Sequence, residues 1–194
     1  MQVLLLPFRR VSPGPARNRR SWLRDESGSA AVEFALVAMP FLLFVLGIIG
    51  VGLYFFTQNA LERGVENAAR QIRTGQAQNA GVTVGQFKTL LCNEAGSYID
   101  CSKVSIIVQS ATSWSGIAPQ SCLDANNNMV ASTGASGDLI SKYSGAAKTV
   151  VLVTVCYKWD LAQMFNFLKL GAGPGGTGAA IVQAATTFRS EPYS

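Results

Sequence analysis

The residues of this chain with the most specific chemistry are its four cysteines, Cys92, Cys101, Cys122 and Cys156. All of them follow a long uncharged stretch at residues 34–56. The sequence contains no histidine, so the commonest general base and the commonest metal ligand are both missing. No two of the cysteines form a Cys-x-x-Cys pair, so a zinc site is not expected. Their even number instead predicts two disulfides, if they lie in an oxidising compartment.

A second group of residues imitates the start of a calcium loop. Asp124, Asn126 and Asn128 have the required spacing. However, Met129 occupies the position that needs glycine, and Ala135 occupies the position that needs a bidentate glutamate. We therefore expect a polar surface loop there and no metal.

Three glycines, Gly171, Gly173 and Gly176, match a dinucleotide-binding fingerprint on paper. Pro174 interrupts the match, and a strand pattern follows where the fingerprint needs a helix. We expect a hairpin loop and no cofactor. Because the sequence offers no constellation of nucleophile, base or metal ligands, it is not expected to be an enzyme.

The uncharged stretch is long enough to cross a membrane. It contains 23 residues, 34–56, and a helix of that length extends roughly 34 Å, compared with ~30 Å for the hydrocarbon core of a bilayer. The sequence thus predicts one membrane-spanning helix, which must set the position of everything that follows it.

The charges around this stretch predict its orientation. Six arginines precede it, and no lysine or arginine then follows until Arg63. The positive-inside rule places residues 1–28 in the cytoplasm and the chain after about residue 58 across the membrane. In a bacterium with a periplasm that side is oxidising, as two disulfides require. The net charge of +5 is therefore a sign of topology and not of a nucleic-acid partner.

The junction before the span carries a recognisable pattern. Residues 28–34 read Gly-Ser-Ala-Ala-Val-Glu-Phe, and here the sequence resembles the type IV prepilin class, specifically the TadE-like pseudopilins of tight-adherence (Flp) pilus systems. Residues 188–193 are similar to the usual ending of that family. The resemblance implies that a membrane aspartyl peptidase, the prepilin peptidase, cuts between Gly28 and Ser29. It also implies that Glu33 and Phe34 serve recognition or register.

Glu33 has two interpretations. A carboxylate costs about 2.5 to 3.5 kcal/mol at the centre of a bilayer and much less near the interface, so it needs a partner. If cleavage frees an ammonium group at Ser29, the N-terminus of a neighbouring subunit could pair with Glu33 and set the axial register of packed helices. Alternatively, Glu33 is only the interfacial end of an uncleaved anchor and is stabilised by the helix dipole.

Beyond the membrane the helix pattern continues as far as Gly75. Leu61, Val65, Ala68 and Ile72 recur at helical spacing, which is typical of an apolar stripe that needs a covering layer. Three strands are predicted after it, at residues 104–110, 149–159 and 179–188. The other expected segments are a linker at 76–86, a short helix at 85–96, a polar excursion at 114–147 and an apolar turn or short helix at 161–170.

These elements predict an α+β fold in which the long helix packs on a small antiparallel sheet, and the resemblance implies the same pilin-like plan. We expect a basic leader at residues 1–28, a transmembrane and amphipathic helix at 29–75 and a periplasmic domain at 76–194. Four cysteines allow three connectivities. We favour Cys92 with Cys101, which closes a local loop, and Cys122 with Cys156, which would attach the polar excursion to the central strand.

Two functions of different classes fit these features. The first is a minor pseudopilin of the bacterial inner membrane that helps to assemble a pilus for attachment and biofilm formation. Its partners would be the bilayer, the prepilin peptidase, other pilins or pseudopilins and the assembly platform. The second is an unprocessed single-pass membrane protein that presents a periplasmic binding or adhesion module. Removal of the leader distinguishes the two.

Overall fold

The computed structural model describes residues 27–171 and 178–192. Contacts divide the chain into two compact units, Met1–Leu43 and Phe44–Ser194. The long helix α1 (Ser27–Arg73) begins in the first unit and ends in the second. The predicted leader lies almost wholly outside the described residues, as does most of the loop that begins at Gly171.

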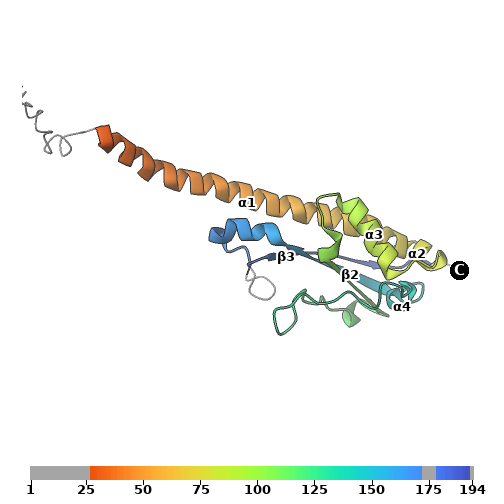
Figure 1. The fold of residues 1–194 in the computed structure, drawn as a ribbon. Coiled ribbons are helices and arrows are strands. Elements are labelled where there is room, and N and C mark those ends of the chain that lie inside the picture. Colours follow the sequence, from red (N-terminus) through yellow and green to blue (C-terminus); the bar gives the residue numbers. More distant parts are fainter. Residues whose placement is uncertain (1–26, 172–177, 193–194) are drawn as a thin grey trace, which may run out of the picture. The chain divides into compact units, whose positions relative to one another are not determined.

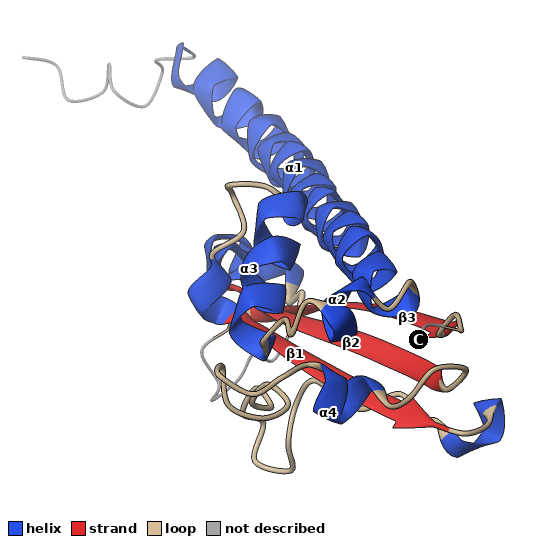
Figure 2. Ribbon diagram, turned by 90° about the vertical axis from the view of Figure 1, so that its right-hand side faces the viewer, coloured by secondary structure: helices blue, strands red, loops and turns tan. Residues whose placement is uncertain are grey.

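The second unit contains a three-stranded antiparallel sheet (Figure 2). Its strands are β1 (Val104–Ala111), β2 (Val150–Trp159) and β3 (Ala180–Arg189). They lie in the order β1-β2-β3, so β2 is the central strand. In register, Val155 of β2 lies opposite Ile106 of β1 and Ala184 of β3. The predicted α+β fold, with three antiparallel strands, is confirmed.

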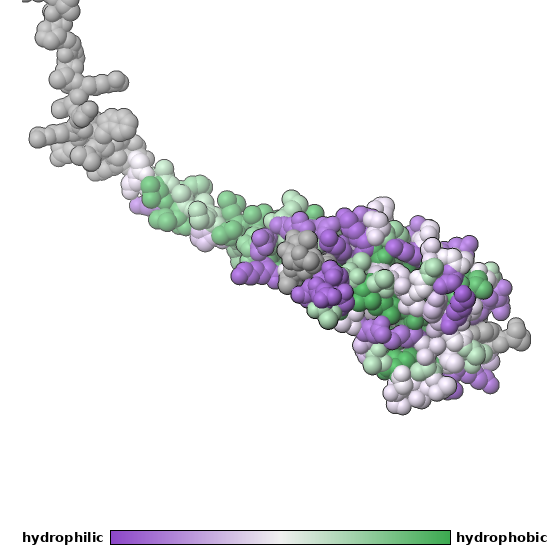
Figure 3. All heavy atoms as spheres, turned by 60° about the horizontal axis from the view of Figure 1, so that its bottom comes forward, coloured by the Kyte–Doolittle hydropathy of each residue, from purple (hydrophilic) through white to green (hydrophobic). Residues whose placement is uncertain are grey.

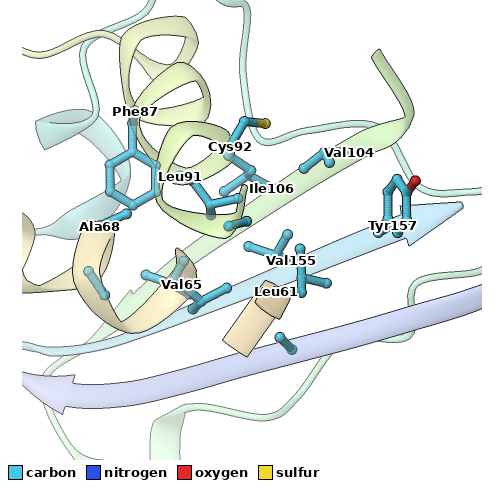
Figure 4. Close-up of a cluster of buried hydrophobic side chains, with 14 of the residues drawn as sticks. Leu61, Val65, Ala68, Phe87, Leu91, Cys92, Val104, Ile106, Val155 and Tyr157 are labelled. Carbon is cyan, nitrogen blue, oxygen red and sulfur yellow. The ribbon is translucent and has the colours of Figure 1, made fainter. Parts of the chain in front are cut away.

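One face of the sheet is covered by the second half of α1. Leu61, Val65, Ala68 and Ile72 are all fully buried, and they share one core cluster with side chains from the three strands (Figure 4). The helical spacing of these apolar residues therefore correctly predicted that the second half of α1 packs on the sheet.

A shorter helix, α3 (Val84–Ala95), packs on the same face beside α1 (Figures 1 and 2). It begins with a capping box, in which Thr83 Oγ1 accepts from the Gln86 N–H at 3.2 Å and Gln86 Oε1 accepts from the Thr83 N–H at 2.9 Å. Its apolar residues Phe87 and Leu91 are fully buried in the core. These contacts bring the backbones of α1 and α3 close together at Gly64.

The other face of the sheet is covered in part by the polar excursion. A small cluster forms there from Ile107, Cys122 and Cys156, with Met129 and Val130 packed against it. The excursion also supplies hydrogen-bond partners to the outer edge of β1, where the Thr133 N–H donates to the Ile106 carbonyl at 2.8 Å. Within it lie the short helices η3 (Trp114–Gly116) and α4 (Ser141–Ser144).

The structure joins the four cysteines as Cys92–Cys101 and Cys122–Cys156, the pairs favoured above. Their Cα atoms lie 6.0 Å and 5.6 Å apart, respectively. The first disulfide ties α3 to the turn η2 (Cys101–Lys103), and the second ties the excursion to β2. A cross-link over a loop of the second kind, with a sequence separation of 34, stabilises a fold by about 3 to 4 kcal/mol.

The linker expected at residues 76–86 is wrong. The short helix α2 (Gln76–Asn79) occupies its start, and Ala77 is buried in the main core. The Ile140 N–H then donates to the Val82 carbonyl at 2.9 Å, and the Val84 N–H donates to the Asp138 carbonyl at 2.8 Å. The polar composition concealed this segment, because the contacts that fix it include bonds of Val82 with Ile140 and of Gln78 with Ser144, far along the chain.

Candidate functional site on the N-terminal helix

The junction residues Gly28 and Ser29 lie in the first turn of α1. A Cβ atom added at Gly28 would find no other atom within 4 Å, so the described structure does not need glycine there for packing. The first N–H groups of a helix have no intrahelical partner, so opening this turn to expose the Gly28–Ser29 peptide bond breaks few hydrogen bonds. A requirement for glycine at this position would therefore come from outside the chain.

The structure brings Ser29 and Glu33 together, one helical turn apart. Ser29 Oγ donates a hydrogen bond to Glu33 Oε1 at 3.4 Å, and both side chains are exposed. Among the described residues no lysine or arginine forms an ion pair with Glu33. The Glu33 carboxylate can therefore accept further hydrogen bonds in addition to the one from Ser29. Phe34, the other predicted recognition residue, has 75% of its surface exposed.

The first part of α1 exposes most of its large apolar side chains. The exposed residues run from Val32 to Phe56, and in the view of Figure 3 this part of the helix is mostly hydrophobic. Within the described residues, α1 is the one helix long and apolar enough to cross a membrane. The described residues therefore contain one candidate membrane span, as expected of a single-pass membrane protein.

The helix changes its surroundings near residues 54–60. The Tyr54 ring lies 5.7 Å from that of Trp159, and the Phe56 ring lies 5.0 Å from that of Tyr98. From Ala60 onward one stripe of the helix is buried. Aromatic residues of this kind are common at the boundary between membrane and water.

Three glycines in the span, Gly47, Gly50 and Gly52, could allow close packing of helices. A Cβ atom at Gly50 would lie 2.8 Å from Leu168 Cδ1 and 2.9 Å from Phe165 Cδ1, whereas one at Gly52 would meet nothing within 4 Å. At Gly50 the close approach is therefore made by Leu168 and Phe165 of the same chain.

The C-terminal residues bind the end of α1, a contact that the sequence did not predict. The Glu191 N–H donates to the Arg73 carbonyl at 2.8 Å, and Arg73 Nε lies 3.4 Å from Glu191 Oε1. The available signal was an arginine in the last turn of the helix and a glutamate near the C-terminus. Such opposite charges are too common on protein surfaces to identify a pair.

The residues that imitated a calcium loop form a closed turn. Asp124 Oδ1 accepts hydrogen bonds from the N–H groups of Asn126 and Asn128, each at 2.8 Å. The Asp124 carboxylate therefore stabilises its own loop through these hydrogen bonds. In the part of the chain that the structure describes, no group of three or more histidine, cysteine or acidic residues could hold a metal ion.

Comparison with known proteins places the N-terminal helix in a family. The family model of TadE-like proteins matches residues 28–70, which confirms the resemblance seen at the junction. No curated protein and no solved structure matches the chain. The family is associated with pili of the tight-adherence type and is not enzymatic. Residues 28–70, which contain the Gly28–Ser29 junction, Glu33 and most of α1, are therefore similar to the TadE-like protein family.

Proposed function

We propose that this protein is a minor pseudopilin that takes part in the assembly of a tight-adherence type IV pilus and so supports surface attachment and biofilm formation. The observation that carries the proposal is the family match, which begins at Gly28, the residue after which the prepilin peptidase would cut. The exposed apolar surface of α1 supports it, because helices of this kind can pack in a membrane or against one another.

The proposed topology is a cytoplasmic leader at residues 1–28, a helix at 29–75 that crosses the inner membrane and a periplasmic domain at 76–194. Two observations support it. The arginines of the leader lie on one side of the span, as expected for a cytoplasmic segment. The four cysteines form two disulfides on the other side, as expected for an oxidising compartment.

Glu33 would act after cleavage. Removal of the leader leaves an ammonium group on Ser29, and Glu33 of one subunit would pair with that group on its neighbour. Two opposite charges attract far more strongly at low dielectric than in water, so the pair would fix the axial register of adjacent helices. The partners in this step are other pilins or pseudopilins of the same system and the assembly platform.

A pair of glycine variants tests the cleavage step. Gly28 and Gly52 both lie in α1, and an added Cβ atom meets nothing within 4 Å at either position. The full chain is produced with the prepilin peptidase, and its mass is measured. We expect Gly28→Leu to keep the leader, because the side chain blocks the peptidase, and Gly52→Leu to be processed like the natural chain.

Equal processing of the two variants would show that Gly28 is not part of the recognised site. A natural chain that keeps its leader in the presence of the peptidase would refute the pseudopilin proposal. That result would favour the alternative, an unprocessed membrane protein that presents residues 76–194, called the outer domain below, as a binding module.

A further inference from the structure

An apolar helix of the outer domain lies against the membrane-spanning part of α1. This element, η4 (Asp160–Leu168), is the blue helix beside α1 in Figure 1. Its Leu168 and Phe165 side chains occupy the space above Gly50, and Leu168 Cδ2 lies 3.6 Å from a Cβ atom placed at Gly47. Gly47, Gly50 and η4 all belong to the unit Phe44–Ser194.

The level of this contact along α1 places η4 at the membrane. Gly47 and Gly50 precede Phe56, the last residue of the uncharged stretch, by about 14 and 9 Å of helix, respectively. If the bilayer core reaches Phe56, η4 lies inside it. If the span begins at Ser29 instead, about 20 residues cross the core and end near Ile48, so η4 lies at its surface. Both positions bring η4 into contact with lipid.

The side of η4 that faces away from α1 suits such a contact. Met164 is 75% exposed, Phe167 48% and Leu161 40%. Residues 161–168 carry no charge. Their exposed polar side chains are the amides of Gln163 and Asn166, which cost far less to bring to a membrane surface than a charge would. The element that carries these side chains contacts α1 at Gly47 and Gly50, next to Ile48 and Ile49, which are 59% and 48% exposed.

Charged and aromatic groups stand at the start of η4. Asp160 forms ion pairs with Lys103 at 2.9 Å and with Lys158 at 3.6 Å. The preceding residue, Trp159, packs against Tyr54 of α1. Trp159 is buried in the core of the protein. The partly exposed charges therefore mark the polar boundary of the membrane at the start of η4, with the apolar part of η4 on its lipid side.

We propose that η4 is a second membrane contact, which inserts Leu161, Met164 and Phe167 into the outer boundary of the bilayer and holds the outer domain directly on it. The occupant is lipid and not a second copy of the chain, because η4 contacts the part of α1 that a membrane must cover in a single molecule. The proposal requires the membrane span but not processing or pilus assembly.

Photo-crosslinking of the full-length protein tests this contact. The photoreactive residue p-benzoylphenylalanine replaces Met164 in one variant and Trp114 in a matched control. Trp114 is also an exposed large apolar residue, at 60%, but it lies in η3 on the polar excursion. Each variant is reconstituted in liposomes of phosphatidylethanolamine and phosphatidylglycerol and irradiated, and its mass is measured. Intact disulfides show that each variant has folded.

We expect lipid adducts at position 164 in at least about tenfold excess over position 114, because the reaction requires direct contact. A label at Phe167 should behave like the label at Met164. Equal yields at positions 164 and 114, or no lipid adduct at 164 and 167, would overturn the proposal. Crosslinks from position 164 to a second protein chain in place of lipid would also overturn it and would show that η4 is an interface between subunits.

Discussion

Glu33 is an exposed carboxylate at the edge of a candidate membrane span, and its hydrogen bond with Ser29 is long and therefore weak. The Ser29 hydroxyl donates at 3.4 Å and carries no charge. A buried or membrane-embedded charge is stable only when a partner compensates it. Among the described residues Glu33 thus has no charged partner, which supports the proposed pairing with another subunit.

Replacement of Glu33 by glutamine should impair assembly without impairing folding. We expect Glu33→Gln to reduce co-purification with pilin subunits by about tenfold or more, which corresponds to about 1.4 kcal/mol of lost interaction. Glu66→Gln is the matched control, because Glu66 is an exposed glutamate of the same helix beyond the span. Thermal unfolding of both variants should equal that of the natural chain. Similar assembly by the two variants would contradict a register role for Glu33.

Asp138 gives the outer domain a defined response to acid. Its carboxylate accepts hydrogen bonds from Lys142 Nζ at 2.9 Å, Tyr143 OH at 2.8 Å and the Ala135 N–H at 3.0 Å. These donors, Lys142 first, lower the pKa of Asp138 from 3.8 to about 2. Because the folded pKa lies below the unfolded one, the stabilisation is present above pH 3.8 and is lost as the pH falls towards about 2.

The variant Asp138→Asn should therefore lose less stability than the natural chain between pH 4 and pH 2. Part of the response will remain, because hydrogen bonds from Ser102 also lower the pKa of Asp100. The measurement is the thermal unfolding of the full chain in detergent over this pH range. An unchanged slope in Asp138→Asn would show that this carboxylate is not stabilised in the folded state.

At the scale of elements, α1 meets two different surroundings. Its first part is exposed and apolar, whereas its second part packs on the sheet and on α3. The second contact is closest at Gly64, where an added Cβ atom would lie 2.8 Å from Ala95 Cβ and 2.8 Å from the Leu91 carbonyl oxygen. The backbones of α1 and α3 can approach this closely only because residue 64 has no side chain.

A side chain at Gly64 should destabilise the outer domain. We expect Gly64→Val to lower the free energy of unfolding by about 1 to 3 kcal/mol, the usual cost of overpacking. Gly52→Val is the control, because a Cβ atom added at Gly52 meets no atom within 4 Å. Denaturant unfolding of the detergent-solubilised chain measures both. A Gly64→Val protein as stable as the control would contradict the close crossing of the two helices.

The long helix, its buried stripe and the three strands were predictable because each has a regular period. Leu61 and Ile72 repeat at helical spacing, and β2 is rich in valine. The junction from Gly28 to Phe34 was also readable, because its pattern is local in the sequence. The close packing at Gly64 and at Gly50 was not, since a glycine carries no signal of which element approaches it. Nor was the order in residues 76–82, because the partners of Val82 and Gln78, Ile140 and Ser144, lie far along the chain.

At the scale of the whole molecule, the chain combines an apolar helix with a domain that two disulfides stabilise. Arg73 and Glu191 bind the last turn of α1 to the C-terminal residues. The helix thus continues directly into the core of the domain at Leu61 to Ile72. Within the unit Phe44–Ser194, the second half of α1 is therefore fixed to the rest of the domain.

The N-terminal residue of the mature protein tests this account most directly. The full chain is extracted from membranes of cells with and without the prepilin peptidase, and its intact mass is measured before and after reduction. The account predicts a chain that begins at Ser29 only when the peptidase is present, and a gain of about four hydrogens on reduction of its two disulfides. A chain that keeps Gly28 and the preceding arginines under both conditions would contradict it.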